Sequence, residues 1–252
     1  MSHPLPDQAK IWSHFQNEGL ASFDAARPRH DFLSRKLARL ARGNPRLLNI
    51  GAGSGYMEKL MLARGWRVST LDPDERAIAR LKASGVDARC GVIEQMPFEE
   101  GRFDIVAASE VLEHLDDRQR GIGLGECRRV LRGGGIFAGT VPWRENLSAE
   151  EVLCPQCTLK FHRWGHQKSF TIEALHSELA AVFDDVSVGR TAFTRDQPGL
   201  LRKLMALARV LAAAAGQVPP NLCVYFTARK LSERKNRPAG EQPHHSSRIV
   251  NL

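Results

Sequence analysis

The sequence predicts an α/β fold in which a mostly parallel sheet carries helices on both faces. The first observation is that strand-like and helix-like segments alternate through most of the chain, which is typical of parallel sheets. The second is a glycine-rich turn at 51–55, between a short apolar segment and a helical one. The third is Asp72, an acidic residue that ends the next predicted strand, about twenty residues beyond the turn.

Each predicted element has its own local signal. Residues 8–42 carry apolar side chains at helical spacing and end at a Gly-Asn-Pro sequence, which terminates a helix. Short apolar runs predict strands at 47–50 and 103–109, and three consecutive glycines at 133–135 form a turn before a strand at 136–141. The other expected strands are 67–71, 88–90, 183–191 and 221–230, and the other expected helices are 56–64, 75–84, 118–131, 171–181 and 199–215.

This topology places several polar turns on one edge of the sheet. Ligands of parallel sheets bind outside the carboxyl ends of the strands. The glycine turn, Asp72 and residues 109–111 each follow a predicted strand, so we expect them to share that edge. Glycines permit positive φ and close approach of the backbone to a ligand. The spacing is G-x-G-x-G, so the third glycine of a dinucleotide-binding turn is displaced, which disfavours a nicotinamide dehydrogenase.

The chain divides into five predicted regions. Residues 1–44 are an N-terminal helical cap, and 45–142 form the nucleotide-binding core. Residues 143–170 are a polar insertion rich in Cys and His, and 171–231 complete the sheet around an inserted helix. Residues 232–252 are expected to be a disordered basic tail.

Charge and cysteine usage narrow the function classes. The chain has 252 residues and a formal net charge of +8, and residues 229–252 contribute six Lys or Arg and two Glu. We interpret the tail as a solubilising segment, with binding of RNA or phosphate as the alternative. The sequence has no secretory signal and no run of eighteen apolar residues that predicts a transmembrane segment. The five cysteines are an odd number, which predicts a reducing, cytoplasmic compartment.

Several motifs, in order along the chain, resemble the class I S-adenosylmethionine-dependent methyltransferases. They are 48–55, Leu71-Asp72-Pro73, Gln95-Met96-Pro97-Phe98 before 103–106, 109–115 and 128–135. The resemblance covers roughly residues 45–230, and the set is far more specific than any one motif. It implies a Rossmann-like, doubly wound, mostly parallel seven-stranded sheet with an antiparallel last strand.

The resemblance also implies the residues that bind the methyl donor, S-adenosyl-L-methionine. The backbone of the glycine turn would cradle its methionine part, Asp72 would take the ribose hydroxyls, and 92–93 would border the adenine. The residues expected to bind this cofactor are Asn49, Gly51, Ala52, Gly53, Gly55, Asp72, Pro73, Val92, Ile93, Ser109 and Glu110. Family members often carry Asp at positions 49 and 92, so here Glu94 or backbone carbonyls are left to contact the adenine.

The activity that this resemblance implies is transfer of a methyl group to a small-molecule acceptor, most simply at oxygen. One alternative is a methyltransferase that modifies RNA, although no appended RNA-binding module is evident and nucleic acid is not an expected partner. Another is a catalytically silent module that binds a partner through the Cys/His insertion. The sequence leaves the acceptor and the oligomeric state open.

Glu110-x-x-Glu113-His114 follows the fourth predicted strand and holds the expected catalytic residues, His114 and Glu113. On a helical turn these side chains share a face. His114 is a candidate general base. Alternatively, the trio binds a divalent metal, as resembling residues do in the small-RNA 2′-O-methyltransferases and the ubiquinone-pathway O-methyltransferases. In the third interpretation, His114 is a structural residue that shapes the pocket.

The second constellation is a zinc-like pattern in the insertion. Cys154 and Cys157 have the spacing of a zinc knuckle, and His162 and His166 are at a finger-like separation that completes a tetrahedral, structural Zn²⁺ site. The alternative is a reduced cysteine pair with unligated histidines. The whole segment resembles an insertion in a subgroup of these methyltransferases, and it is expected to be a substrate lid with the aromatic residues Trp143, Phe161 and Trp164.

The apolar segment 199–215 has three interpretations. The first is a packing helix between the last two strands. The others are a substrate cap and an interfacial helix that makes peripheral contact with a membrane.

Overall fold

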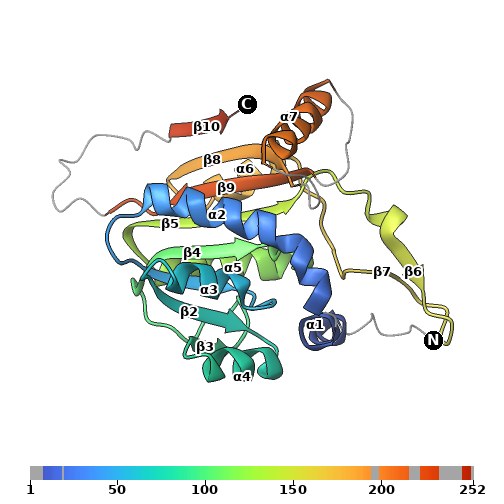
Figure 1. Ribbon diagram of the computed structural model, residues 1–252, viewed down its shortest axis with the longest axis horizontal. Helices are drawn as coiled ribbons and strands as arrows, with labels where there is room; N and C mark the ends of the chain where they lie inside the picture. The colour runs from blue at the N-terminus through green and yellow to red at the C-terminus, as the bar shows by residue number, and fades with distance from the viewer. Residues whose placement is uncertain (1–7, 19, 194–198, 216–221, 233–245, 251–252) are drawn as a thin grey trace.

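The structure is a computed structural model that describes residues 8–18, 20–193, 199–215, 222–232 and 246–250. Its centre is an eight-stranded sheet in the order β10-β8-β9-β5-β4-β1-β2-β3 (Figure 1). All pairs are parallel except those of β9, which runs antiparallel to both β5 and β8. The strands are β1 Arg46–Ile50, β2 Arg67–Asp72, β3 Asp87–Cys90, β4 Phe103–Ser109, β5 Leu131–Pro142, β8 Asp185–Ala192, β9 Leu222–Arg229 and β10 Ser246–Val250.

The fold prediction is confirmed. Seven of these strands were expected, and the antiparallel β9 is the last of the seven along the chain. The helices are α1 Gln8–Asn17, α2 Arg27–Leu40, α3 Tyr56–Leu62, α4 Glu75–Ala83, α5 Asp117–Val130, α6 Ile172–Ala180 and α7 Gly199–Ala214. Short 3₁₀ helices are η1 Leu20–Ala26, η2 Leu112–His114 and η3 Leu147–Glu150.

Two apolar cores, one on each face of the sheet, explain the doubly wound arrangement. Side chains alternate along a strand, so Leu47 belongs to the core under α2, α3 and α4. Its neighbour Leu48 belongs to the core under α5, α6 and α7. Because both faces are buried, the central strands are near-continuous apolar runs. This burial fixes which strand ends lie together and so positions the site.

The N-terminal cap is built of helices, as residues 8–42 predict. It consists of α1, η1 and α2, and α2 begins with Pro28 in its first turn. Proline is tolerated in the first turn because the N–H groups there have no acceptor within the helix, whereas inside a continuous helix its missing N–H would break a hydrogen bond. η1 leads directly into α2, and α1 lies near the carboxyl ends of the central strands (Figure 1).

The insertion leaves the sheet after β5 and returns at Phe170, which bridges to Trp143. Between them lie η3 and a two-stranded hairpin of β6 Glu151–Leu153 and β7 Lys160–His162. Residues 165–168 lie next to η2, because the backbone N–H groups of Gln167 and Lys168 both donate to the carbonyl of Glu113. The hairpin itself extends beyond α1 (Figure 1).

The sequence predicts an irregular C-terminal tail over residues 232–252, but part of this tail is a strand. Residues 246–250 form β10, which pairs in parallel with residues 185–189 of β8. The rest of the expected tail beyond residue 232 lies outside the described residues. None of the described helices is both long and apolar enough to cross a membrane.

Candidate functional site

A cavity of about 620 Å³ opens at the carboxyl ends of β1, β2 and β4. This volume lies within the range of about 300–1,000 Å³ that small-molecule sites occupy. The glycine turn, Asp72 and residues 109–111 all contribute to its wall, as their shared position at strand ends predicted. α1 and η1 supply the opposite wall through Trp12, Gln16 and Phe23.

The glycine turn forms a cradle that a side chain would fill. Gly51 and Gly53 both have positive φ, of 88° and 50°. A Cβ on Gly53 would lie 3.2 Å from the ring of Phe23, and one on Gly51 would lie 3.2 Å from Val111. Gly55 precedes α3 with φ 79°, and its Cβ would instead meet Leu81, so it shapes the turn without lining the cavity. The backbone at 51–53 is therefore free for close contact with a ligand.

Asp72 is a buried carboxylate that faces this cradle. Its Oδ2 accepts a hydrogen bond from the N–H of Ala52 at 2.7 Å, and its Oδ1 accepts one from the N–H of Asp74 at 2.8 Å. Burial raises its pKa, and these two donors oppose that effect. Nε2 of Gln16 also donates to Oδ1, over a long 3.4 Å. A carboxylate has about four lone-pair positions, so Asp72 keeps one for a ligand hydroxyl and gains a second where a ligand displaces Gln16.

Asn49 supports the turn from below rather than lining the cavity. Its Nδ2 donates to the carbonyl of Gly51 at 2.9 Å and to Oε1 of Glu58 at 2.7 Å. Thr70 donates to the same Glu58 oxygen at 2.8 Å. Glu58 is fully buried, and burial raises its pKa. Asn49 therefore positions the turn, and Glu58 is a carboxyl group that the sequence reasoning missed.

One end of the cavity is apolar with a polar rim. Val92, which follows the edge strand β3, is 46% exposed and lines the cavity. Ile93 and Pro73 lie on the same wall. Glu94 accepts a hydrogen bond from Nε2 of Gln119 at 2.8 Å. This end offers a flat apolar contact and one carboxylate, as a purine ring requires.

The other end of the cavity is polar. Ser109 shares a hydrogen bond of 2.9 Å with Thr140, and Glu110 has φ 57°, in the left-handed region. This conformation turns Glu110 towards Arg29 of α2, whose Nη1 lies 3.7 Å from Oε2 of Glu110. Strained residues of this kind cluster at ligand sites. Arg29 belongs to no recognisable motif and comes from the N-terminal cap, far away along the chain, so it was not predicted.

His114 lines this polar end and Glu113 lies behind it. Burial, and then the nearby His166 ring, lower the pKa of His114 to about 3. Hydrogen bonds to the backbone of Gly165 and Glu110 act in the opposite direction but are outweighed. His114 is therefore neutral at ordinary pH. Glu113 is fully buried, and burial together with the charge of Glu110 raises its pKa well above the ordinary value.

α1 seals the polar end through aromatic contacts. The Trp12 ring meets the His114 ring edge-on, with centroids 4.3 Å apart. Phe15, on the next part of the same helix, packs on Trp164 of the insertion with centroids 4.9 Å apart. The cap residues Trp12, Gln16 and Phe23 were missed from sequence, because helical periodicity does not show which tertiary partner a helix meets.

The structure does not gather the four residues expected to bind zinc. Within the described residues, His162 and His166 cluster with Glu145, and neither Cys154 nor Cys157 contributes to that cluster. Nδ1 of His166 lies 2.5 Å from Oε2 of Glu145. The spacing of the four residues did not predict their arrangement, because they lie at opposite ends of the β6–β7 hairpin. The two cysteines are in its turn, and the two histidines are at the end of β7 and after it.

The cysteine pair forms a turn of its own. The N–H of Thr158 donates to the carbonyl of Cys154 at 2.9 Å. The backbone N–H groups of Cys157 and Gln156, together with the Cys157 thiol, lower the pKa of the Cys154 thiol. This is a knuckle with two accessible sulfurs.

The aromatic residues expected in a lid lie outside the cavity wall. Trp143 belongs to the buried core, where the guanidinium groups of Arg144 and Arg190 lie over its ring. Trp164 packs on Phe15 of α1, and Phe161 lies on β7. The cover over the cavity is therefore α1, with the insertion packed behind it.

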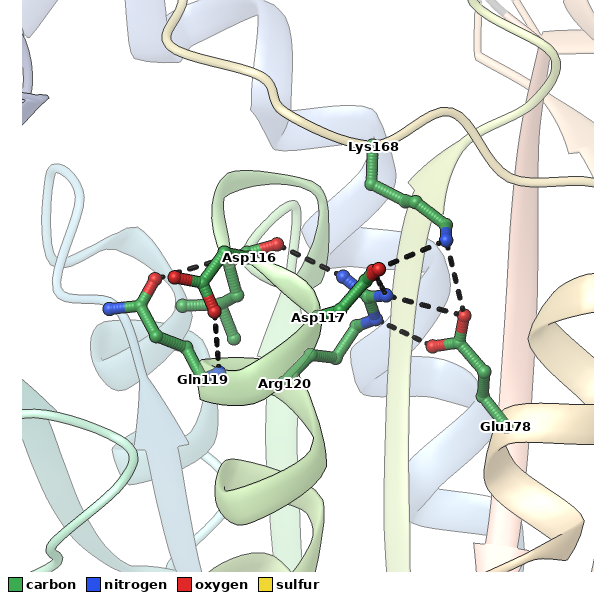
Figure 2. A network of polar contacts seen from close by, with 7 residues as sticks. Asp116, Asp117, Gln119, Arg120, Lys168 and Glu178 are labelled. Atoms are coloured by element: carbon green, nitrogen blue, oxygen red, sulfur yellow. Dashed lines mark hydrogen bonds and ion pairs between the residues drawn. The ribbon is translucent and has the colours of Figure 1, made fainter. Parts of the chain in front are cut away.

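A polar network holds the insertion against α5 and α6 (Figure 2). Arg120 is 4% exposed, and its Nε donates to Glu178 at 2.5 Å. Lys168 lies 3.4 Å from Asp117 and 3.7 Å from Glu178. At the start of α5, Asp116 and Gln119 form a reciprocal capping box. The network fixes residues 165–168 beside η2.

Known proteins that are similar to this chain in sequence are methyltransferases. Residues 48–139 match the family model of a methyltransferase domain. A "probable S-adenosylmethionine-dependent methyltransferase" of Mycolicibacterium smegmatis is 35% identical over 57% of this chain and 56% of its own length. The ubiquinone biosynthesis O-methyltransferase of Nitrobacter winogradskyi is 37% identical over 46% of this chain and 45% of its own length. The chain spans about half the length of these curated relatives.

Solved structures share the fold at low identity. The 1,6-didemethyltoxoflavin-N1-methyltransferase of Burkholderia thailandensis, solved with S-adenosylhomocysteine, has a TM-score of 0.58 at 19% identity, covering 92% of this chain and 94% of that one. A SAM-dependent methyltransferase of Archaeoglobus fulgidus has a TM-score of 0.56 at 15% identity, covering 81% and 97%. Residues 48–139, which include the glycine turn and the central strands, therefore match a methyltransferase domain, and the sheet has the fold of S-adenosylmethionine-dependent methyltransferases of known structure.

Proposed function

We propose that the protein transfers a methyl group from S-adenosylmethionine to a hydroxyl oxygen of a small-molecule acceptor. The observation that carries the proposal is one cavity with two unlike ends. The glycine turn, Asp72 and Val92 surround one end, and His114, Arg29 and Glu110 surround the other. A donor and an acceptor held in such a cavity would meet at its middle.

The residues at the first end fit the methyl donor. Asp72 can accept from the two ribose hydroxyls, one at its free position and one in place of the long contact from Gln16. Val92 and Ile93 offer an apolar surface for the adenine, and the backbone at 51–53 can approach the methionine part. When bound, this cofactor supplies an electrophilic methyl group on a sulfonium centre. Because its leaving group is good, the chain mainly needs to orient the acceptor and exclude water.

The residues at the second end suit an oxygen acceptor. Nε2 of His114 is buried without a hydrogen-bond partner among the described residues. Its lone pair can interact with an acceptor hydroxyl, either directly or through a cation bound beside it. The O-methyltransferases of ubiquinone biosynthesis, which match the central part of the chain, support oxygen as the methylated atom. α1 closes this end, which favours an acceptor of small size.

Methyl transfer can be tested with the full chain and ¹³C-methyl-labelled S-adenosylmethionine. The acceptors are matched sets of phenols, catechols, carboxylic acids and amines, with total RNA as a separate arm. We expect label in a small hydroxyl compound, with the ¹³C chemical shift of a methyl group on oxygen. Label only in amines would overturn the choice of oxygen, and label only in RNA would overturn the small-molecule acceptor.

A further inference from the structure

One side of α7 is apolar and faces the solvent. Leu204, Leu207 and Leu211 are each between 50% and 57% exposed, although leucine is a residue that proteins usually bury. Their spacing of three and four residues places them on one side of the helix. The other large hydrophobic residues that are exposed in the described part of the chain, such as Leu62 and Leu153, stand singly on different segments. Single exposed residues are ordinary, whereas a contiguous stripe is typical of an interaction surface.

The opposite side of α7 is already used for packing. Val210 and Ala213 are buried in the apolar core that also holds α5 and α6, and Ala206 packs against this core. α7 therefore rests on β8 with one side and turns its leucines outward with the other. None of its described residues lines the cavity, which disfavours the interpretation of α7 as a substrate cap.

The charge of the helix has one sign. Residues 199–215 contain Arg202, Lys203 and Arg209, and they contain no Asp or Glu. The exposed apolar stripe therefore belongs to a basic segment. A partner that covers this stripe has to tolerate, or attract, three positive charges.

Carboxylates on the elements around α7 do not offset this charge, because arginines already hold them. Glu178 of α6 lies 2.5 Å from Nε of Arg120. Asp184, just before β8, lies 2.7 Å from Nη1 of Arg128. These ion pairs cancel the negative charge of both side chains.

The C-terminal tail brings further positive charge to the same margin of the molecule. Residues 229–252 hold six Lys or Arg and two Glu. Within them, β10 includes Arg248 and pairs with β8, the strand on which α7 packs. Figure 1 shows α7 and β10 on the side of β8 that is away from the central strands.

An anionic lipid surface fits this face better than a second copy of the chain does. Two copies of α7 would bring like charges together, because neither helix has a carboxylate. Three half-exposed leucines also fall far short of the roughly 800 Å² per partner that a stable protein interface buries. A helix at a membrane surface needs less apolar area, because insertion of apolar side chains and attraction to anionic headgroups act together.

We propose that α7 docks the protein on an anionic bilayer surface, with Leu204, Leu207 and Leu211 inserted at the boundary between headgroups and acyl chains. The positive charge of residues 199–215 and of the tail supplies the attraction that a short apolar stripe lacks by itself. α7 follows the carboxyl end of β8, which lies at the edge of the sheet where the cavity opens. Docking would therefore hold this edge near the lipid, whichever molecule the protein methylates.

Flotation of the full chain with lipid vesicles tests the surface without any activity measurement. Vesicles of phosphatidylcholine alone are compared with vesicles of phosphatidylcholine and phosphatidylglycerol in equal amounts. We expect the chain to bind the anionic vesicles at least about 10-fold more tightly than the neutral ones. This binding should weaken as the salt concentration is raised, because salt screens the attraction.

Substitution of the leucines separates docking from folding. Leu207→Gln/Leu211→Gln should lower the affinity for anionic vesicles by at least about 10-fold, because two inserted side chains become polar. Both positions are exposed, so the variant should unfold and bind S-adenosylhomocysteine like the wild type. The matched control is Leu62→Gln/Leu153→Gln, which changes two exposed leucines on other elements and should bind vesicles as the wild type does.

Substitution of the charges tests the choice of lipid. Arg202→Gln/Lys203→Gln should weaken binding to the anionic vesicles by about fivefold for each charge removed. Equal affinity for neutral and anionic vesicles, or no vesicle binding at all, would overturn the proposal. A wild-type dimer that does not float with vesicles, and that Leu207→Gln/Leu211→Gln separates into monomers, would also overturn it, because a second copy would then cover the leucines. None of these results bears on the proposed function, which depends on methyl transfer.

Discussion

Asp72 combines two tasks at the residue scale. It holds the glycine turn and the start of α4 through the N–H groups of Ala52 and Asp74, and it presents its remaining lone pairs to the cavity. An amide of the same shape can do neither fully, because one of its two polar atoms is a donor. The same carboxylate therefore both holds the glycine turn in place and offers acceptors to a ligand in the cavity.

We expect Asp72→Asn to weaken S-adenosylhomocysteine binding by about 10- to 100-fold, because hydrogen bonds to a charged group contribute about 1.5–3 kcal/mol. Isothermal titration measures the change. The matched control is Asp104→Asn, at the amino end of β4 and remote from the cavity, which should bind like the wild type. Equal affinity of the two variants would remove Asp72 from the cofactor site.

Gly53 and Gly65 separate backbone strain from steric blocking. Both have positive φ, but a Cβ on Gly53 meets Phe23 at 3.2 Å, whereas a Cβ on Gly65 meets nothing within 4 Å. Gly53→Ala and Gly65→Ala should each destabilise the fold by about 1 kcal/mol. Only Gly53→Ala should reduce S-adenosylhomocysteine affinity. A similar loss in both variants, measured by titration at matched folded fraction, would contradict the cradle.

Local residue order predicted the glycine turn and Asp72, because each is defined by its place after one strand. The pairing of His114 with His166 was not predictable in this way. The two rings meet because the backbone of 167–168 binds that of Glu113. Such contacts depend on tertiary structure, and the Cys-x-x-Cys spacing pointed to a different partner for His166.

At the scale of elements, Asp104 ties three strands together. Its Oδ2 accepts from the N–H of Arg46 on β1 at 2.8 Å, and its Oδ1 contacts the guanidinium of Arg132 on β5. Burial alone would raise the pKa of Asp104, but these donors outweigh burial and lower it below 3.8. The ionised form is therefore the one that stabilises the sheet.

The sign of the pH dependence follows from that lowered pKa. The stabilisation is fully present above the unfolded-state pKa of about 3.9 and is lost as pH falls through the folded-state value. Asp104→Asn should therefore cost about 0.5–1 kcal/mol at pH 7, a modest value because the group is partly exposed. Its unfolding curve should converge with that of the wild type at the lowest pH at which both still fold. A difference that stays constant between pH 7 and pH 3 would contradict this account.

The central strands were predictable because both faces of the sheet are buried, so their sequences are long apolar runs. Helices were predicted at the N-terminus, but the boundary between α1 and α2 was not placed, although Pro28 marks it, because the quoted apolar spacing lies within α2. β10 was missed for a different reason: residues 246–250 are short and mixed in polarity, and their strand depends on pairing with β8.

On the scale of the whole molecule, the N-terminal cap and the insertion meet over the cavity. Trp12 of α1 touches His114, and Phe15 of the same helix packs on Trp164. Segments that are far apart in sequence thus form one cover. The carboxyl end of α1 is also held by Asn17, whose Nδ2 donates to the carboxylate of Asp74 at 3.1 Å. The aromatic contact with the insertion is thus the anchor of the middle of the helix.

Trp164→Ala should loosen α1 without unfolding the core. We expect faster hydrogen exchange of residues 8–17, with unchanged exchange in β1 and β4. Phe161→Ala, an aromatic truncation in the same hairpin, is the control for general damage to the insertion and should leave α1 protected. Unchanged exchange of α1 in Trp164→Ala would show that the helix is held by other contacts.

The central claim is that this cavity binds the methyl donor, and isothermal titration of the wild-type chain with S-adenosylhomocysteine tests it most directly. The account predicts one site per chain, with a Kd between about 1 μM and 1 mM and the negative heat-capacity change of apolar burial. A folded chain that shows no binding at millimolar S-adenosylhomocysteine would contradict it.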